Sequence, residues 1–132
     1  MLAARDLDFA RSEVAALTAV STAVRVPCHH DYTGRNWLTS NGTVAVIDFE
    51  WAALDAPAAD VARLYLGAWH DRPDLREAFL EGYGRALDDT GDAILRGCAA
   101  LTAVWLTVKA RETSQPSFEE ASRTALRRLM TR

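Results

Sequence analysis

The dipeptide Asn41-Gly42 is the feature that most constrains the fold of this chain of 132 residues. It lies between two strand-like segments, NWLT and VAVID. Asn-Gly is the strongest short-range signal for a β-hairpin, because both residues accept the positive φ angles of a tight turn. A two-residue turn would place Asn36 opposite Ile47, and a three-residue turn would place it opposite Asp48. In either register, Asn36 and Asp48 lie at the open end of the hairpin.

The pattern on both sides of the hairpin is helical. Apolar residues at helical spacing predict an amphipathic helix from about Leu7 to Ala23. Pro57 suits the first turn of another helix. The apolar stretch from Ala93 to Val108 predicts a helix that is buried on most sides, with Trp105 in the core. The whole pattern predicts a mainly α (α+β) fold, with about five helices around one short β-hairpin and a single domain over residues 1–132.

Composition excludes several classes of function. Hydrophobic residues make up 49% and charged residues 25%, which is typical of a globular domain. A net charge of −3 argues against sequence-independent nucleic-acid binding. The longest apolar stretch is interrupted by Arg96, so we expect no membrane span. Cys28 and Cys98 have no CxxC spacing, and the first residues lack a signal-peptide pattern, so we expect a cytoplasmic protein.

The open end of the hairpin has the composition of a reaction centre. Directly opposed residues of a hairpin have Cβ atoms about 5 Å apart. An amide oxygen and a carboxylate at this distance, such as those of Asn36 and Asp48, can share Mg²⁺ with water and phosphate oxygens. Asp31 lies five residues before Asn36, across a loop that contains Gly34. If the loop returns it to the same end, Asp31 can accept a proton from an incoming nucleophile.

Two motifs in this region resemble a known family. HHDYTGRNWL followed by VIDFE is similar to the H-x-D-x-x-x-x-N catalytic loop and the metal-binding Asp of the aminoglycoside phosphotransferase and choline kinase family. These enzymes are distant relatives of protein kinases. The continuation WAALDAPAADVARLY resembles the family's G-D-P-x-x-D-L-A stretch. The resemblance covers residues 26–65 through specific motifs, and the surrounding helices more loosely.

The resemblance implies a division of labour among the polar residues of the loop and hairpin. Asp31 would be the catalytic base, and Arg35 would lie near the transferred phosphate. Asn36 and Asp48 would bind Mg²⁺, or Mn²⁺ in its place. ATP would be the co-substrate, and the partner would be a small-molecule hydroxyl acceptor that is aminoglycoside-like, choline-like or of another kind.

Further residues would support these four or contact the substrate. The resemblance implies that His30 braces the catalytic loop through hydrogen bonds, and that Asp60 is a buried anchor for the backbone N–H groups of that loop. Glu50 follows the metal-binding Asp where protein kinases have glycine, so the resemblance assigns it no role; it is a candidate for substrate binding. No partner can be named for His29 from the sequence.

The family also needs a Gly-rich loop and a Lys that contacts the nucleotide phosphates. Lys109 is the only lysine of the chain, and no glycine cluster precedes the catalytic loop. The sequence therefore resembles a C-terminal lobe with the nucleotide-binding lobe absent, which we expect to be inactive by itself. Loss of that lobe would expose Trp37, Phe49 and Trp51, so we expect a homodimer or association through this face.

Other interpretations stay open at this stage. The lobe could act as a non-catalytic kinase-like binding or interaction module. Asp31 and Asn36 could merely satisfy the backbone of a polar loop. The His29-His30-Asp31 run is also compatible with a zinc hydrolase, although adjacent side chains diverge and no third ligand stands at a recognisable spacing.

Overall fold

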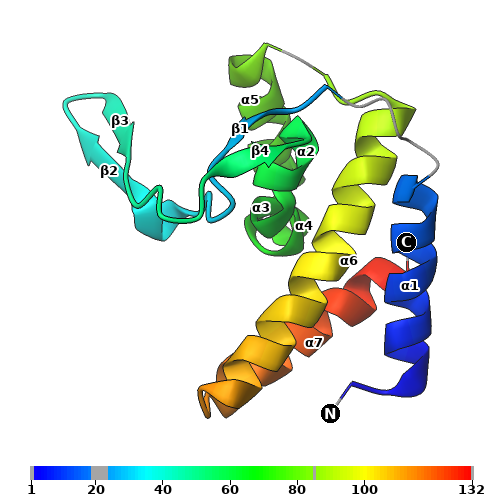
Figure 1. Cartoon of the computed structure of the whole chain (residues 1–132). Helices are drawn as coiled ribbons and strands as arrows, with labels where there is room; N and C mark the ends of the chain where they lie inside the picture. Colours follow the sequence, from blue (N-terminus) through cyan, green and yellow to red (C-terminus); the bar gives the residue numbers. More distant parts are fainter. Residues whose placement is uncertain (1, 19–23, 85, 132) are drawn as a thin grey trace.

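The structure is a computed structural model that describes residues 2–18, 24–84 and 86–131. This part of the chain is mainly helical, as the sequence predicted (Figure 1). Its α-helices are α1 (Ala4–Thr18), α2 (Pro57–Asp60), α3 (Ala62–Leu66), α4 (Ala68–Asp71), α5 (Pro73–Tyr83), α6 (Asp89–Glu112) and α7 (Pro116–Met130). Its strands are β1 (Val26–Cys28), β2 (Trp37–Ser40), β3 (Thr43–Val46) and β4 (Ala53–Asp55), and a 3₁₀ turn covers Gly34–Asn36.

The described residues contain more helices than the five predicted, because residues 57–71 divide into three short helices. Pro57 is in the first turn of α2, as expected. Val61 and Gly67 then leave helical geometry and separate α2, α3 and α4. The first helix ends at Thr18, and the end predicted for it near Ala23 lies outside the described residues.

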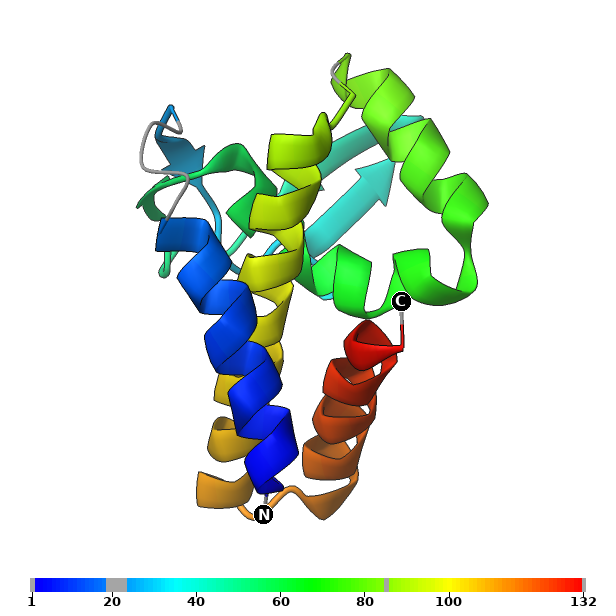
Figure 2. The same cartoon turned by 90° about the vertical axis from the view of Figure 1, so that its right-hand side faces the viewer.

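Helix α6 is the central element, with α1 and α7 along one part of it and α2 and α3 against another (Figures 1 and 2). One face of α6 is fully buried and consists mostly of small side chains at a spacing of three to four residues: Leu95, Ala99, Ala103, Thr107 and Ala110. Small residues let the neighbouring helices approach closely. At Gly97 a Cβ atom would lie only 2.6 Å from Cγ of Leu17, so any larger residue there would force the Leu17 side chain to move.

The opposite face of α6 is exposed, and here the sequence prediction was wrong. Leu101, Trp105 and Val108 are 47%, 52% and 47% exposed, so Trp105 is not a core residue. Periodicity identifies an apolar face but does not tell whether another element covers it. By length and composition alone, α6 also qualifies as a membrane-spanning helix, contrary to the sequence expectation. Half of the apolar stretch of α6 is buried by the rest of the domain, and the core helix of a soluble protein can have the same length and composition.

The hairpin β2–β3 projects away from the helices (Figure 1). Trp37 pairs with Val46 and Ser40 with Thr43, so Asn41-Gly42 is a two-residue turn. Both turn residues have positive φ angles, 48° and 76°, as a type I′ turn requires. This register decides between the two alternatives left open by the sequence.

The aromatic residues around the hairpin differ in their exposure. Phe49 and Trp51 are 58% and 61% exposed, as expected for this face. Trp37 is only half-buried rather than exposed, because its ring packs against Tyr32 with ring centroids 5.1 Å apart.

A second small sheet, which the sequence did not predict, joins distant segments. Strand β1 runs antiparallel to β4, with Val26 opposite Asp55 and Cys28 opposite Ala53. This pairing holds the start of the loop of residues 29–36 beside the segment that leads into α2. It therefore brings Asp60 close to residues that are some thirty positions earlier in the chain.

Candidate active site

Asp31 lies at the centre of the candidate site and is 6% exposed. Its Oδ1 accepts a hydrogen bond from Arg63, and its Oδ2 accepts hydrogen bonds from Arg35 and from Nδ2 of Asn36 at 3.0 Å. Burial alone would raise the pKa of this carboxyl. The hydrogen bonds and charges of Arg35, Arg63 and Asn36 outweigh burial and hold the pKa below its ordinary value of 3.8. Asp31 is therefore an ionised carboxylate at neutral pH.

Asn36 connects the loop to the hairpin. Its Nδ2 donates to the carboxylate of Asp31 and also to the backbone oxygen of Asp31 at 2.9 Å. Its backbone oxygen accepts a hydrogen bond from the N–H of Ile47 at 3.0 Å. Asp48 is the next residue, so Asn36 and Asp48 share the open end of the hairpin, as predicted. The five-residue loop does return Asp31 to this end.

The histidine whose side chain braces the loop is His29, whereas His30 contributes through its backbone N–H. His29 is 3% exposed, and its Nδ1 accepts a hydrogen bond from the N–H of Asp31 at 3.2 Å. An unprotonated Nδ1 leaves the proton on Nε2, which donates to the backbone oxygen of Ile47 at 2.8 Å. A neutral His29 thus ties the catalytic loop to the residue before Asp48. The H-x-D spacing contained this signal, since His29 is two residues before Asp31.

The side chain of His30 does not brace the loop by a hydrogen bond, and this corrects the sequence prediction. Its Nε2 lies 3.8 Å from a carboxylate oxygen of Asp55, which is beyond hydrogen-bonding distance. His30 has a positive φ of 62°, and its backbone N–H contributes to the loop instead.

Asp60 makes the backbone contacts that the sequence predicted. One of its oxygens, Oδ1, accepts N–H groups from His29 at 2.7 Å and from His30 at 2.8 Å. Two successive backbone N–H groups that converge on one carboxylate form an anion-binding arrangement. This contact favours the positive φ of His30. Asp60 itself is half-buried rather than fully buried.

Asp48 and Glu50 follow the hairpin and are both exposed. Asp48 has a φ of 68°, a left-handed conformation that is uncommon for a residue other than glycine and is often found at functional sites. The ring of Phe49 lies 4.5 Å from that of His29, centroid to centroid, and holds this turn against the loop. Glu50 stands in the turn after Asp48 and is not one of the cavity-lining residues described below.

The donors at the open end of the hairpin fit a divalent cation that is shared with phosphate groups. Because Nδ2 of Asn36 donates to Asp31, its amide oxygen faces away from that carboxylate and remains available as a ligand. The exposed carboxylate of Asp48 can supply a second oxygen, and Mg²⁺ commonly takes one or two protein oxygens together with phosphate and water. The zinc-hydrolase alternative has no support in the part of the chain that the structure describes. Within residues 2–18, 24–84 and 86–131, no three His, Cys, Asp or Glu side chains cluster closely enough to hold a metal.

Arg63 is a site residue that the sequence prediction missed. It lies on α3, three residues after Asp60, and its side chain is 18% exposed. Its guanidinium pairs with Asp31, and burial lowers its pKa more than the charge of Asp31 raises it. The available signal was a single arginine in the otherwise apolar run VARLYL.

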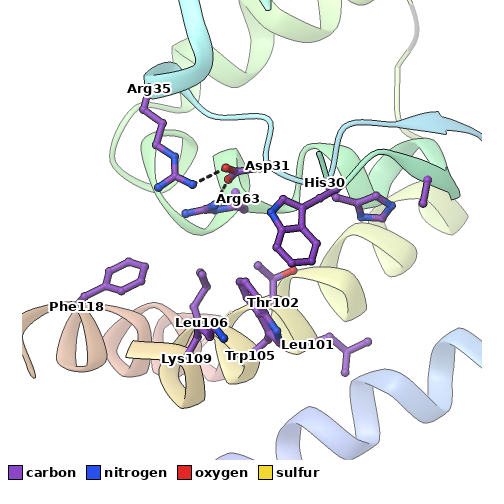
Figure 3. Close-up of a pocket in the computed structure, with 12 residues that line it drawn as sticks. His30, Asp31, Arg35, Arg63, Leu101, Thr102, Trp105, Leu106, Lys109 and Phe118 are labelled. Atoms are coloured by element: carbon purple, nitrogen blue, oxygen red, sulfur yellow. Dashed lines mark hydrogen bonds and ion pairs between the residues drawn. The ribbon is translucent and has the colours of Figure 1, made fainter. Parts of the chain in front are cut away.

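Asp31 opens into a cavity of about 580 Å³ (Figure 3). His30, Asp31, Arg35 and Arg63 form one side of it, and side chains of α6 and α7 form the opposite side. Its volume is in the range of small-molecule sites.

Comparisons with known proteins agree with this geometry. The sequence profile of the phosphotransferase enzyme family matches residues 2–98, which is more than half of the chain. A search of curated protein sequences found no match.

Solved structures of an aminoglycoside phosphotransferase, APH(4)-Ia, share the fold. The apo form of a thermostable mutant is 18% identical with a TM-score of 0.76, and the match covers 95% of this chain and 43% of that protein. A ternary complex of such a mutant with AMP-PNP and hygromycin B is 18% identical with a TM-score of 0.73, and the match covers 95% and 42%. The chain therefore spans less than half the length of these structures, and identities this low show the fold alone.

Proposed function

Because the chain belongs to the phosphotransferase enzyme family, we propose that it is the C-terminal lobe of a kinase, which carries the catalytic loop and the acceptor site. The kinase transfers the γ-phosphate of ATP to a hydroxyl group of a small molecule. The observation that carries this proposal is that Asn36 links Asp31 to the backbone next to Asp48. Asn36 donates to Asp31 through its side chain and accepts from Ile47, the neighbour of Asp48, through its backbone.

Asp31 is the proton acceptor for the substrate hydroxyl. A carboxylate offers about four acceptor positions, and three are taken by Arg35, Asn36 and Arg63. The remaining position is on Oδ1, the oxygen that bonds to Arg63. A hydroxyl that donates its proton to this position keeps the lone pairs of its oxygen free to attack the incoming phosphoryl group.

Arg35 and Arg63 place positive charge beside Asp31, where the transferred phosphate would lie. The side chain of Arg35 is 64% exposed, so it can turn from Asp31 toward a phosphate at little cost in burial. Arg63 is largely buried and stays on Asp31. Mg²⁺, or Mn²⁺, bound by the amide oxygen of Asn36 and the carboxylate of Asp48 would neutralise charge on the phosphates of ATP.

The 132 residues lack a Gly-rich loop and a phosphate-binding lysine, since Lys109 lies on α6. We therefore expect no ATP turnover by this chain alone. In a longer form that includes a nucleotide lobe, Asp31→Asn should lower kcat by two or more orders of magnitude and leave nucleotide affinity nearly unchanged. Near-normal turnover by that variant would remove Asp31 from its role as base.

Metal binding tests the proposal on the 132-residue chain itself. Mn²⁺ should broaden the NMR signals of residues around Asn36 and Asp48, and more strongly when AMP-PNP is present. The variant Asp48→Ala should abolish the broadening, and Asp71→Ala, which removes an exposed carboxylate on α4, should leave it unchanged. Broadening centred on α4 and α5, or no effect of Asp48→Ala, would refute the assignment. A non-catalytic module, the alternative function, predicts that AMP-PNP does not enhance the broadening.

A further inference from the structure

The two sides of the cavity next to Asp31 differ in chemistry. The side formed by the catalytic loop and α3 is polar and carries Asp31, Arg35 and Arg63 (Figure 3). The opposite side is mostly apolar, with Leu101, Trp105 and Leu106 from α6 and Phe118 from α7. An acceptor that presents its hydroxyl to Asp31 must therefore place the rest of its surface against α6 and α7.

The charges of the cavity lining disfavour a substrate that carries amines. Within the described part of the chain, the lining contains three cationic side chains and one carboxylate, that of Asp31; the cations are Arg35, Arg63 and Lys109. Asp31 is already bonded to both arginines, and Lys109 lies 3.6 Å from Glu112, which is not a lining residue. Among the described residues that line the cavity, no second carboxylate is available to an ammonium group. A polycation would meet like charges without compensation.

The apolar side chains of α6 that line the cavity are not needed to pack this helix into the domain. Helix α6 already buries its opposite face against α1 and α7. Even so, Leu101 and Trp105 are 47% and 52% exposed toward the cavity, and Trp51 at its edge is 61% exposed. Apolar and aromatic side chains that stay exposed in a concave site, next to a few polar groups, are typical of small-molecule recognition.

We propose that the acceptor is a hydroxyl compound that carries no cationic group and has a large apolar surface, which lies on Trp105 and its neighbours and directs the hydroxyl to Asp31. This inference rests on the proposed function and specifies its substrate class. It separates this chain from the similar APH(4)-Ia structure that contains hygromycin B. Arg35 serves the transferred phosphate, Arg63 holds Asp31, and the apolar face of α6 serves the acceptor.

Binding to the 132-residue chain tests the inference without any need for turnover. We would titrate the chain with two probes and follow amide chemical shifts: 4-methylumbelliferyl β-D-glucoside, which is uncharged, and hygromycin B, which is cationic. The glucoside should bind about tenfold or more tightly than hygromycin B. Its shifts should centre on Leu101, Trp105 and the loop around Asp31.

Two variants locate the binding. Trp105→Ala changes a side chain that is half exposed, so the domain should keep its fold, and glucoside affinity should fall about tenfold or more. Tyr83→Ala is the matched control, because Tyr83 is an aromatic residue of similar exposure that lines a different cavity. It should leave affinity unchanged. An equal loss in both variants would show general apolar adsorption and overturn the inference.

The comparison of the probes tests the ligand class directly. Hygromycin B binding as tightly as the glucoside would overturn the non-cationic class, and the absence of binding by the glucoside at millimolar concentration would overturn the site. The Mn²⁺ and AMP-PNP experiment reports separately on the proposed function. Glucoside binding without the metal effect would refute the kinase function and leave the ligand class intact. The metal effect without glucoside binding would refute the acceptor class alone.

Discussion

Replacing Asp60 by alanine should destabilise the domain strongly, because one oxygen of this residue holds two backbone N–H groups of the catalytic loop. The two bonds are 2.7 Å and 2.8 Å long and involve His29 and His30. The N–H of His29 belongs to a residue that is only 3% exposed, so water cannot easily replace the lost acceptor. His30 is half-exposed, so its N–H can find water.

The expected cost follows from these two environments. A hydrogen bond to a charged group contributes about 1.5–3 kcal/mol, and a bond that water replaces contributes less, about 0.5–1 kcal/mol. The sum predicts a loss of about 2–4 kcal/mol in the free energy of unfolding for Asp60→Ala. For a domain of this size, each kcal/mol lowers Tm by about 3–4 °C, so Tm should fall by roughly 6–16 °C.

Two further variants serve as comparisons: one separates the charge of Asp60 from its acceptor oxygen, and the other is a control on an exposed carboxylate. Asp60→Asn keeps an oxygen that can accept both N–H groups but loses the charge, so it should cost about 1 kcal/mol. Asp71→Ala removes an exposed carboxylate whose partner, Arg128, is 3.8 Å away, and it should cost about 0.5 kcal/mol or less. Urea unfolding of the three variants and the parent chain, with hydrogen exchange of the His29 and His30 amides, would measure these differences. A loss below about 1 kcal/mol for Asp60→Ala, or equal losses in the Ala and Asn variants, would refute the reasoning.

Three other predictions follow from the site and its surroundings. The lowered pKa of Asp31 contributes stability that is complete above its ordinary value of 3.8 and is lost as pH falls through the folded value. Urea unfolding should therefore show a larger difference between the parent chain and Asp31→Asn at pH 7 than at pH 3, and an equal difference would contradict this. Burial and then nearby carboxylates raise the pKa of Cys28 and Cys98 to about 11, so both thiols should react with Ellman's reagent at pH 8 only after unfolding; rapid reaction of the folded chain would contradict it. Exposed Phe49 and Trp51 should make the chain self-associate, most simply as a two-fold dimer, at micromolar concentration. Sedimentation should show a shift toward monomer when both are replaced by serine, and a monomeric parent chain would refute the proposal.

The sequence by itself determined the local features of this protein. Asn41-Gly42 selects a type I′ turn because both residues tolerate positive φ, and this turn sets the register that places Asn36 beside Ile47. Apolar periodicity determined the helical character of the chain in the same way. The spacing of Asp31, Asn36 and Asp48 predicted that the three residues share the open end of the hairpin, because all three lie within one loop and one hairpin.

Only the tertiary structure decided which side chains serve that site from a distance. His29 rather than His30 braces the loop because the ring orientation depends on Ile47, which the hairpin returns to it. Arg63 reaches Asp31 because the pairing of β1 with β4 brings α2 and α3 to the loop. Trp105 is exposed because no described element covers that face of α6. These outcomes depend on contacts between residues far apart in the chain, whereas turn type and helical periodicity depend on neighbours.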